Sequence, residues 1–179
     1  NGSKGFELSE DNYLNYFTEW LKALFNTGDY ETYCSFLNQI LMLESDNPTV
    51  KLFACNDLLK VLTLTEQNSS LVYKCLDFLK DMHKKYPHGK HTVQVINNII
   101  FTSLELGEPI PQNLLNDFIP TIPLHPCNTA TYGLYLIKIK HNAERGLSYY
   151  DSAMVMAQKD SKFAGLTEEL KVKKEIESA

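Results

Sequence analysis

The sequence predicts an all-α fold: a right-handed stack of antiparallel helix pairs, that is, an α-solenoid of about four pairs followed by a C-terminal helix. Three observations predict this architecture. Apolar residues recur at helical spacing along most of the 179 residues, and no segment shows the period of two typical of a strand. Short turns join successive helices and force neighbours to run antiparallel. The odd-numbered helices start near residues 10, 48, 90 and 128, so a two-helix unit repeats about every 40 residues.

The first two helices are expected before residue 48. The first begins at Ser9, a favourable N-cap, and its apolar stripe extends to Leu24. Residues 26–29 form a break, and a second apolar stripe covers residues 33–41. The turn between these stripes has only a few residues, so we expect the two helices to pair antiparallel.

Three more helices are expected between residues 48 and 107. The third covers residues 48–62, with a proline in its first turn, where proline is tolerated. Ser69 caps the fourth, which stops at the Tyr-Pro-His-Gly sequence of residues 86–89. The fifth has its apolar stripe over residues 93–104 and ends at Gly107.

Prolines divide the last third of the chain. A short sixth helix follows the prolines of residues 109–111 and carries Leu114, Leu115 and Phe118. Pro120, Pro123 and Pro126 then mark a loop that is not expected to be helical throughout. A seventh helix is expected over residues 128–139, an eighth over residues 143–158 and a charged closing helix over residues 166–176.

These elements divide the chain into three parts. We expect residues 1–8 to be a tag or linker, residues 9–159 a helical-repeat domain and residues 160–179 a C-terminal capping helix. The whole is expected to belong to a larger intracellular protein of the cytoplasm or nucleus. The basis for a reducing compartment is that the four cysteines stand alone, without the spacing of a metal site or a disulfide framework.

Charge and hydropathy restrict the partners. The net charge is −5, and the cations are sixteen lysines against a single arginine, Arg145. Arginine provides the two-pronged contact that suits phosphates, so this composition disfavours a surface that follows a nucleic-acid backbone. No apolar run approaches the ~20 residues that span a bilayer, and no membrane partner is expected.

Two segments resemble known helical repeats. Gly28-Asp29-Tyr30-Glu31, the apolar stripe after it and the exit at Asp46-Asn47-Pro48 resemble the second helix of a tetratricopeptide repeat. Residues 128–137, with a partner helix ending near Met154, are similar to a pentatricopeptide unit. The resemblance implies a curved surface that receives a protein segment, or single-stranded RNA in the pentatricopeptide case.

Catalytic and metal sites are not expected. The sequence has no GxGxxG, P-loop, GxSxG or HExxH motif. His88 and His91 lack nearby ligands for a metal, and the His125-Pro126-Cys127 sequence lacks a third group that would make it a nucleophilic site. We therefore expect no catalytic residue, no metal ligand and no cofactor, and a chain that is not an enzyme.

Partner-binding candidates fall in two regions. Asparagines recur in the middle of the third and fifth helices, where a residue of modest helix propensity indicates a ligand-facing row. Basic and aromatic residues gather around the turn between the seventh and eighth helices, where Tyr149 and Tyr150 cannot both face one core. The candidates are Asn56, Asn97, Asn98, Lys138, His141, Tyr149 and Tyr150.

The predicted function is a non-catalytic scaffold for protein–protein interaction, which binds a peptide or helix or associates with itself. Two alternatives stay open at this point. One is a domain of the pentatricopeptide kind that binds single-stranded RNA. The other is a helical enzyme domain without a recognisable motif.

Overall fold

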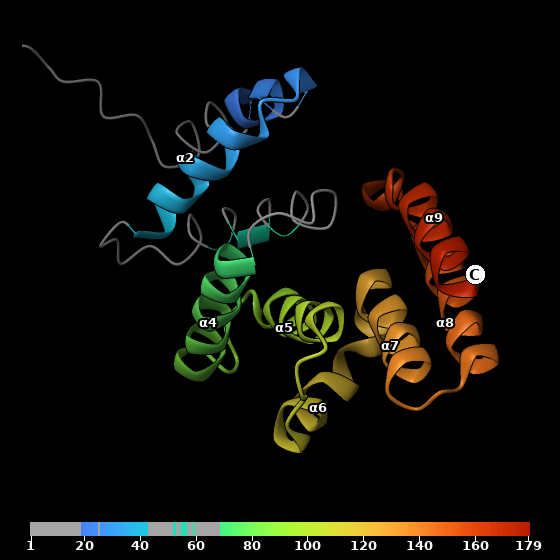
Figure 1. Ribbon diagram of the computed structural model, residues 1–179. Helices are drawn as coiled ribbons and strands as arrows, with labels where there is room; N and C mark the ends of the chain where they lie inside the picture. Colours follow the sequence, from blue (N-terminus) through green and yellow to red (C-terminus); the bar gives the residue numbers. More distant parts are fainter. Residues whose placement is uncertain (1–18, 25, 43–51, 53–54, 57–58, 60–68) are drawn as a thin grey trace, which may run out of the picture. The chain divides into compact units, whose positions relative to one another are not determined.

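The computed structural model describes residues 19–24, 26–42, 52, 55–56, 59 and 69–179 of the chain. All regular structure within these ranges is helical, and they contain no strand, which confirms the all-α prediction (Figure 1). The first expected helix is described over residues 19–24, and the described residues of the third are also helical. None of the described helices combines the length and the apolar character needed to cross a bilayer.

The chain divides into an N-terminal unit of residues 1–75 and a C-terminal unit of residues 76–179, and each is described by itself. The helices and 3₁₀ turns are α2 (Tyr30–Met42), α4 (Ser69–Lys85), α5 (Thr92–Leu106), α6 (Gln112–Phe118), η1 (Ile119–Leu124), α7 (Pro126–Lys138), α8 (Ala143–Gln158), η2 (Ser161–Phe163) and α9 (Leu166–Ser178). Helix α4 contains the boundary between the two units.

In the N-terminal unit, a side-chain cap starts α2. The Asp29 carboxylate accepts a hydrogen bond from the backbone N–H of Thr32 at 3.1 Å, as an N-cap residue does. The Trp20 ring packs edge-to-face on Phe36 of α2, with 4.2 Å between ring centroids. Among the described residues of this unit, the buried apolar ones are Leu21, Tyr33, Leu52, Cys55, Leu59, Leu71, Val72 and Cys75.

In the C-terminal unit, most residues of α5 between Val95 and Leu104 are buried. The helix ends where Gly107 takes a left-handed conformation with φ of 69°. Its backbone N–H reaches the carbonyl oxygens of Leu104 and Ser103, which satisfies groups left open at a helix end. The predicted stop at Gly107 is therefore confirmed.

The proline-rich segment is more regular than predicted. Residues expected to form a loop form η1, a 3₁₀ turn that contains Pro120 and Pro123. Proline has the φ angle of such a turn and lacks only a donor, so short 3₁₀ helices accommodate it. The helical run breaks at His125, which is extended, and Pro126 occupies the first turn of α7.

A buried asparagine holds this segment in place. The Asn128 side-chain amide donates to the Val93 carbonyl oxygen of α5 at 3.1 Å and to the Thr121 hydroxyl of η1 at 2.8 Å. The Thr121 hydroxyl in turn donates to the Phe118 carbonyl oxygen at 2.7 Å. Three elements are therefore tied together through polar groups that are removed from water.

Helices α7 and α8 approach each other closely at a pair of buried glycines. A Cβ atom placed on Gly133 would lie 2.6 Å from the carbonyl oxygen of Gly146, and one on Gly146 would lie 2.7 Å from the carbonyl oxygen of Gly133. Real Cβ atoms do not come so near, so both positions require glycine. The backbones of the two helices are in direct contact here.

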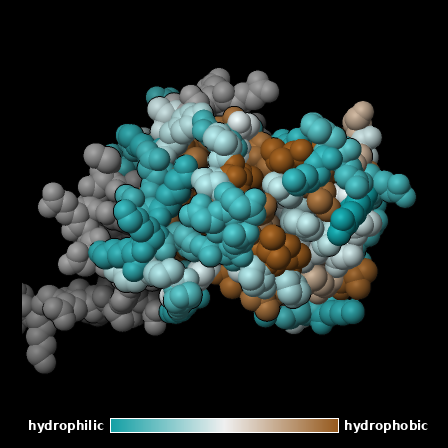
Figure 2. Space-filling model, turned by 90° about the horizontal axis from the view of Figure 1, so that it is seen from below, coloured by the Kyte–Doolittle hydropathy of each residue, from teal (hydrophilic) through white to brown (hydrophobic). Residues whose placement is uncertain are grey.

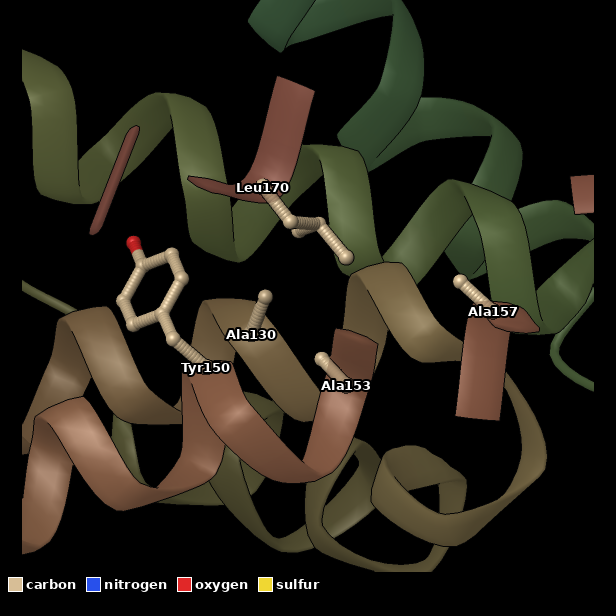
Figure 3. Packing of buried hydrophobic residues seen from close by; sticks show 5 residues of the cluster. All are labelled: Ala130, Tyr150, Ala153, Ala157 and Leu170. Carbon is tan, nitrogen blue, oxygen red and sulfur yellow. The ribbon is translucent and has the colours of Figure 1, made fainter. Parts of the chain in front are cut away.

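The core of the last three helices is built around small residues. Its members are Ala130 of α7, Tyr150, Ala153 and Ala157 of α8 and Leu170 of α9. Figure 3 shows Ala130 and Ala153 pointing toward Leu170. The predicted closing helix, α9, therefore packs against the rest of the unit, because its Leu170 is buried in a core shared with α7 and α8.

Candidate functional site

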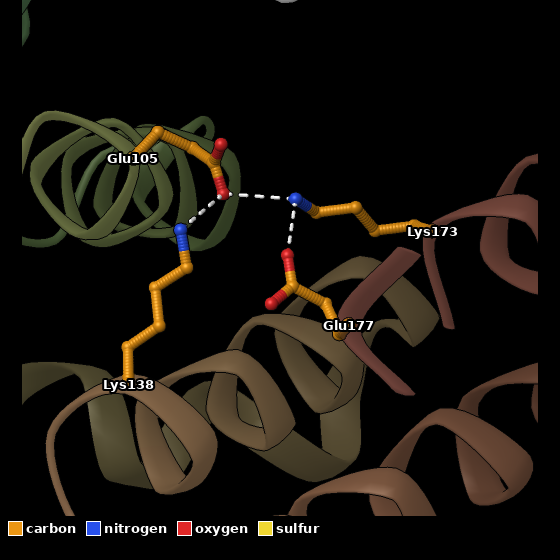
Figure 4. A network of polar contacts seen from close by, with 4 residues as sticks. All are labelled: Glu105, Lys138, Lys173 and Glu177. Atoms are coloured by element: carbon orange, nitrogen blue, oxygen red, sulfur yellow. Dashed lines mark hydrogen bonds and ion pairs between the residues drawn. The ribbon is translucent and has the colours of Figure 1, made fainter. Parts of the chain in front are cut away.

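Lys138, one of the partner-binding candidates, belongs to a network of charges that joins three helices. The Glu105 carboxylate of α5 accepts hydrogen bonds from the Lys138 ammonium of α7 at 3.2 Å and from the Lys173 ammonium of α9 at 2.9 Å. Lys173 also binds the Glu177 carboxylate at 2.6 Å. Figure 4 shows Glu105 between the two lysines. These four charges largely neutralise one another.

The pKa values of this network follow from its partial burial. Burial raises the pKa of Glu105, but the hydrogen bonds and positive charges of Lys173 and Lys138 outweigh it and leave the pKa below its ordinary value. Burial lowers the pKa of Lys173, yet its bonds to Glu177 and Glu105 leave this pKa above its ordinary value. Both shifts favour the charged forms, so the network is a structural ion-pair cluster rather than a proton-transfer site.

The two adjacent tyrosines of α8 have different positions. Tyr150 is 2% exposed and lies in the core, so we assign it to packing and no longer to partner binding. Its burial, together with the negative charges of Glu177 and Glu105, raises the pKa of its phenol. Tyr149 is half-buried, as expected from the geometry of a helix in which neighbouring residues diverge by about 100°.

Tyr149 belongs to a cluster of three tyrosines of α7 and α8, in which Tyr132 and Tyr149 are half-buried and Tyr135 is buried. Its ring meets Tyr132 edge-to-face with 4.9 Å between centroids, and Tyr132 stacks on Tyr135 with 6.0 Å between centroids. The Lys140 ammonium lies over the Tyr135 ring at 5.8 Å from its centroid. His141, another candidate, is exposed in the turn that follows, with φ of 52°. Lys138 instead faces Glu105 of α5, so the candidates around this turn point in different directions.

The three asparagine candidates are divided between the two units of the chain. Asn56 is half-buried in the N-terminal unit, whereas Asn97 and Asn98 belong to α5 of the C-terminal unit. Asn97 is buried, its amide donates to the Asn98 side-chain oxygen at 3.4 Å, and its own side-chain oxygen has no hydrogen-bond partner in the described structure. Asn98 is half-buried. Asn97 is thus an interior residue of α5.

Two histidines of the C-terminal unit, His125 and His83, have structural partners. The Nδ1 atom of His125 accepts a hydrogen bond from the backbone N–H of Cys127 at 3.1 Å, which makes His125 the N-cap of α7. Burial and the charge of Lys162 lower the pKa of His125, in keeping with a neutral imidazole that accepts. His83 pairs with the Asp117 carboxylate of α6 at 3.1 Å. Within the described ranges, no three His, Cys, Asp or Glu side chains gather as metal ligands.

Exposed apolar residues form the remaining surface feature. Figure 2 shows hydrophobic side chains at the surface among polar ones. The large apolar residues of the segment from η1 to α9 that are between 46% and 63% exposed are Ile119, Leu124, Ile139, Val155, Val172 and Ile176. Of these, Val172 and Ile176 are one turn apart on α9, on the side opposite the buried Leu170.

Of the four residues in the charge network, the sequence predicted only Lys138 as a functional candidate. It did not single out Glu105, Lys173 or Glu177. Glu105 and Lys173 are 68 residues apart, and no local pattern indicates that they pair. The exposed apolar pair of α9 did have a signal: Val172 and Ile176 are four residues apart, offset from Leu166 and Leu170 on the same helix.

Comparisons of the chain with protein-family models, with curated proteins and with solved structures found no match. The case for a function therefore depends on the surfaces described above.

Proposed function

We propose that the chain is a non-catalytic helical-repeat scaffold that binds another polypeptide, and that it acts within a larger protein of the cytoplasm or nucleus. Its helices would form a right-handed α-solenoid of antiparallel pairs. Such stacks present extended surfaces on which a peptide or a helix of a partner, or a second copy of the chain, is received.

The contacts of α7 with α8 support pairing of consecutive helices. Thr129 donates to the Met156 sulfur, Tyr132 contacts Tyr149, and Gly133 contacts Gly146. The partner's number falls as the residue number rises, which is the order of an antiparallel pair. Only residues 139–142 separate the two helices, a length typical of an antiparallel helical hairpin.

The contacts between pairs support stacking. Glu105, Lys138 and Lys173 come from α5, α7 and α9, which are alternate helices along the chain, and they meet in one charge network. The apolar core is likewise shared by α7, α8 and α9. A core that continues from one pair into the next is what stabilises repeat proteins, because a single pair buries too little apolar surface by itself.

The exposed apolar side chains carry the proposal of polypeptide binding. One exposed apolar residue is ordinary on a protein surface, but neighbouring ones indicate a surface that is covered by a partner. Val172 and Ile176 are such neighbours on α9, and Ile119 and Leu124 are the exposed first and last residues of η1. Lys173 and Lys174 are paired with carboxylates of this chain, so these charges are not available to a ligand.

Site-specific photo-crosslinking tests the proposal. A photoreactive amino acid is placed at Ile139, Val155 or Val172 in turn in the full chain in cells, with Asn113, an exposed polar residue of α6, as the matched control site. We expect adducts with a polypeptide at one or more apolar sites and none at Asn113. Adducts that ribonuclease removes, or an absence of adducts at all three apolar sites, would contradict the proposal.

Binding of single-stranded RNA is a second candidate, favoured by the tyrosine cluster of α7 and α8. Bases stack on aromatic rings, and the half-buried rings of Tyr132 and Tyr149 lie together with 4.9 Å between centroids. In this case Tyr149 would crosslink to RNA, and the affinity for a mixed-sequence oligonucleotide would fall steeply with salt. Retention of no RNA at low salt would remove this candidate.

A further inference from the structure

Helix α9 has two chemically different sides. Its inner side packs on the rest of the unit through Leu170, which is buried, and through its two central cations. Lys173 binds Glu105 and Glu177, and Lys174 binds the Asp151 carboxylate of α8 at 2.6 Å. The positive charges of residues 173 and 174 are therefore directed inward and matched by carboxylates of this chain.

The outer side of α9 is apolar at its centre and acidic around it. Val172 is 49% exposed and Ile176 is 61% exposed, and their spacing of four residues places them next to each other along the helix. Glu168, Glu169 and Glu175 are exposed and form no ion pair in the described part of the chain, and Lys171 is the one cation among them. The apolar stripe is thus surrounded by three carboxylates and one ammonium group.

We propose that this outer side of α9 is a docking surface for a basic amphipathic helix of another polypeptide. Apolar residues of that helix would pack on Val172 and Ile176, and its lysines or arginines would lie against Glu168, Glu169 and Glu175. The inference rests on the proposed function and adds to it the place of binding and the chemistry of the partner.

Charge and shape select this occupant. A second copy of the chain that used the same side would bring the glutamates of two α9 helices together, and such like-charge contacts oppose association. An anionic membrane surface is disfavoured for the same reason. A helix fits because ridges formed by residues four apart pack into the grooves of a neighbouring helix. Helices α7, α8 and α9 of this chain already pack on one another around a shared core.

The probe is a synthetic 18-residue helix of leucine and lysine, with leucines on one side, labelled and titrated with the full chain while fluorescence anisotropy is measured. Two peptides serve as controls: one has glutamate in place of lysine, and one has the same composition in an order that removes the apolar side. We expect the chain to bind only the leucine–lysine helix. The affinity should fall severalfold between 50 and 150 mM salt, because the contacts are partly electrostatic and exposed.

Substitutions locate the binding. The double variant Val172→Asp/Ile176→Asp should weaken binding by about tenfold or more, as loss of central apolar contacts does. Glu169→Gln/Glu175→Gln should weaken it a fewfold and reduce its salt dependence. Asn113→Asp is the control, since it adds a carboxylate at an exposed position of α6 outside the proposed surface, and binding should stay within about twofold of the wild type. Circular dichroism confirms that each variant is folded.

Three results would overturn the inference. In one, Val172→Asp/Ile176→Asp binds the leucine–lysine helix as the wild type does. In another, the leucine–glutamate helix binds equally well. In the third, sedimentation shows a wild-type dimer that this double variant converts to a monomer, so that a second copy occupies the surface. Polypeptide crosslinks at Ile139 or Val155 without binding of the leucine–lysine helix would leave the scaffold function standing and remove α9 as its site.

Discussion

Gly133 of α7 and Gly146 of α8 contact each other through their backbones, with no room for a Cβ atom on either residue. A Cβ on Gly146 would also contact the side chain of Ile137. The two helices thus touch where both lack a side chain. A Cβ on Gly133 would also lie 3.1 Å from the Cβ atom of Tyr149, a member of the tyrosine cluster, and 3.3 Å from the ring of Tyr150 in the core.

Replacement of either glycine should therefore destabilise the chain. Alanine favours a helix over glycine by about 1 kcal/mol, so Gly146→Ala would stabilise an open position. Here we expect a loss of about 1–3 kcal/mol, because backbone atoms stand where the methyl group must go. Urea unfolding measures the effect. Gly165→Ala is the control, since a Cβ there meets no atom within 4 Å, and it should be neutral or slightly stabilising. Equal stability of the two variants would contradict the expectation.

Removal of the Asn128 amide should loosen the proline-rich segment. Asn128→Ala deletes two hydrogen bonds that join α5, η1 and α7 inside the protein. We expect a loss of about 2–3 kcal/mol of unfolding free energy, since each buried group left without its partner costs about 1–3 kcal/mol. Asn113→Ala removes an exposed asparagine of α6 and should change stability by less than about 0.5 kcal/mol. Thermal unfolding compares the two variants, and a similar midpoint for both would be the contrary result.

The histidine cap of α7 should make stability depend on pH near neutrality. The pKa of His125 is lowered in the folded state, mainly by burial, so the unfolded chain binds a proton more readily. Its contribution is present above the ordinary pKa of 6.5 and is lost as pH falls through the lower, folded-state value. Protonation also removes the Nδ1 acceptor that caps the helix.

His125→Asn keeps a good N-cap that does not titrate. Between pH 7.5 and pH 5, the variant should lose less stability than the wild type, by about 0.5–1 kcal/mol after allowance for the partial exposure of the group. The control is His141→Asn at an exposed turn position with positive φ, where asparagine is tolerated. If His125→Asn and the wild type show the same pH dependence, His125 does not act as described.

The charge network should make the stability of the protein depend on pH in a second, more acidic range. Lys173 and Lys138 hold the pKa of Glu105 below its ordinary value in spite of burial. A carboxylate with a depressed folded-state pKa stabilises the protein above its unfolded pKa and loses that effect as pH falls through the folded value. Glu105→Gln should cost about 1 kcal/mol at pH 7 and flatten the stability profile below about pH 4.5. Glu175→Gln, on the exposed side of α9, should do neither. Urea titrations from pH 7 to pH 3 provide the comparison.

Helix boundaries were predictable where a local residue sets them. Gly107 ends α5 because the left-handed conformation that closes a helix suits glycine, and that preference is a property of the residue itself. The eighth helix matches the predicted residues 143–158. The 3₁₀ turn at Ile119–Leu124 was not predicted, since its order depends on Asn128, a residue outside the turn.

The surfaces were predictable only in part. The sequence indicated that Tyr149 and Tyr150 face different ways, but which of them enters the core depends on how α8 lies against α7 and α9. The partner of Lys138 comes from α5, and nothing near Lys138 in the sequence identifies Glu105. Contacts between residues far apart in the chain decide both cases, and they follow from packing rather than from propensity.

Trp20, which packs edge-to-face on Phe36, is an intrinsic fluorescent probe of the packing around it. Trp20 is the single tryptophan of the chain and belongs to the N-terminal unit, whereas the ten tyrosines are divided equally between the two units. Selective excitation of indole at long wavelength therefore follows the N-terminal unit, while ellipticity at 222 nm also reports on helices α5 to α9 of the C-terminal unit. Coincident denaturation curves from the two signals would mean one cooperative transition, and separated curves would mean that residues 1–75 and 76–179 melt independently.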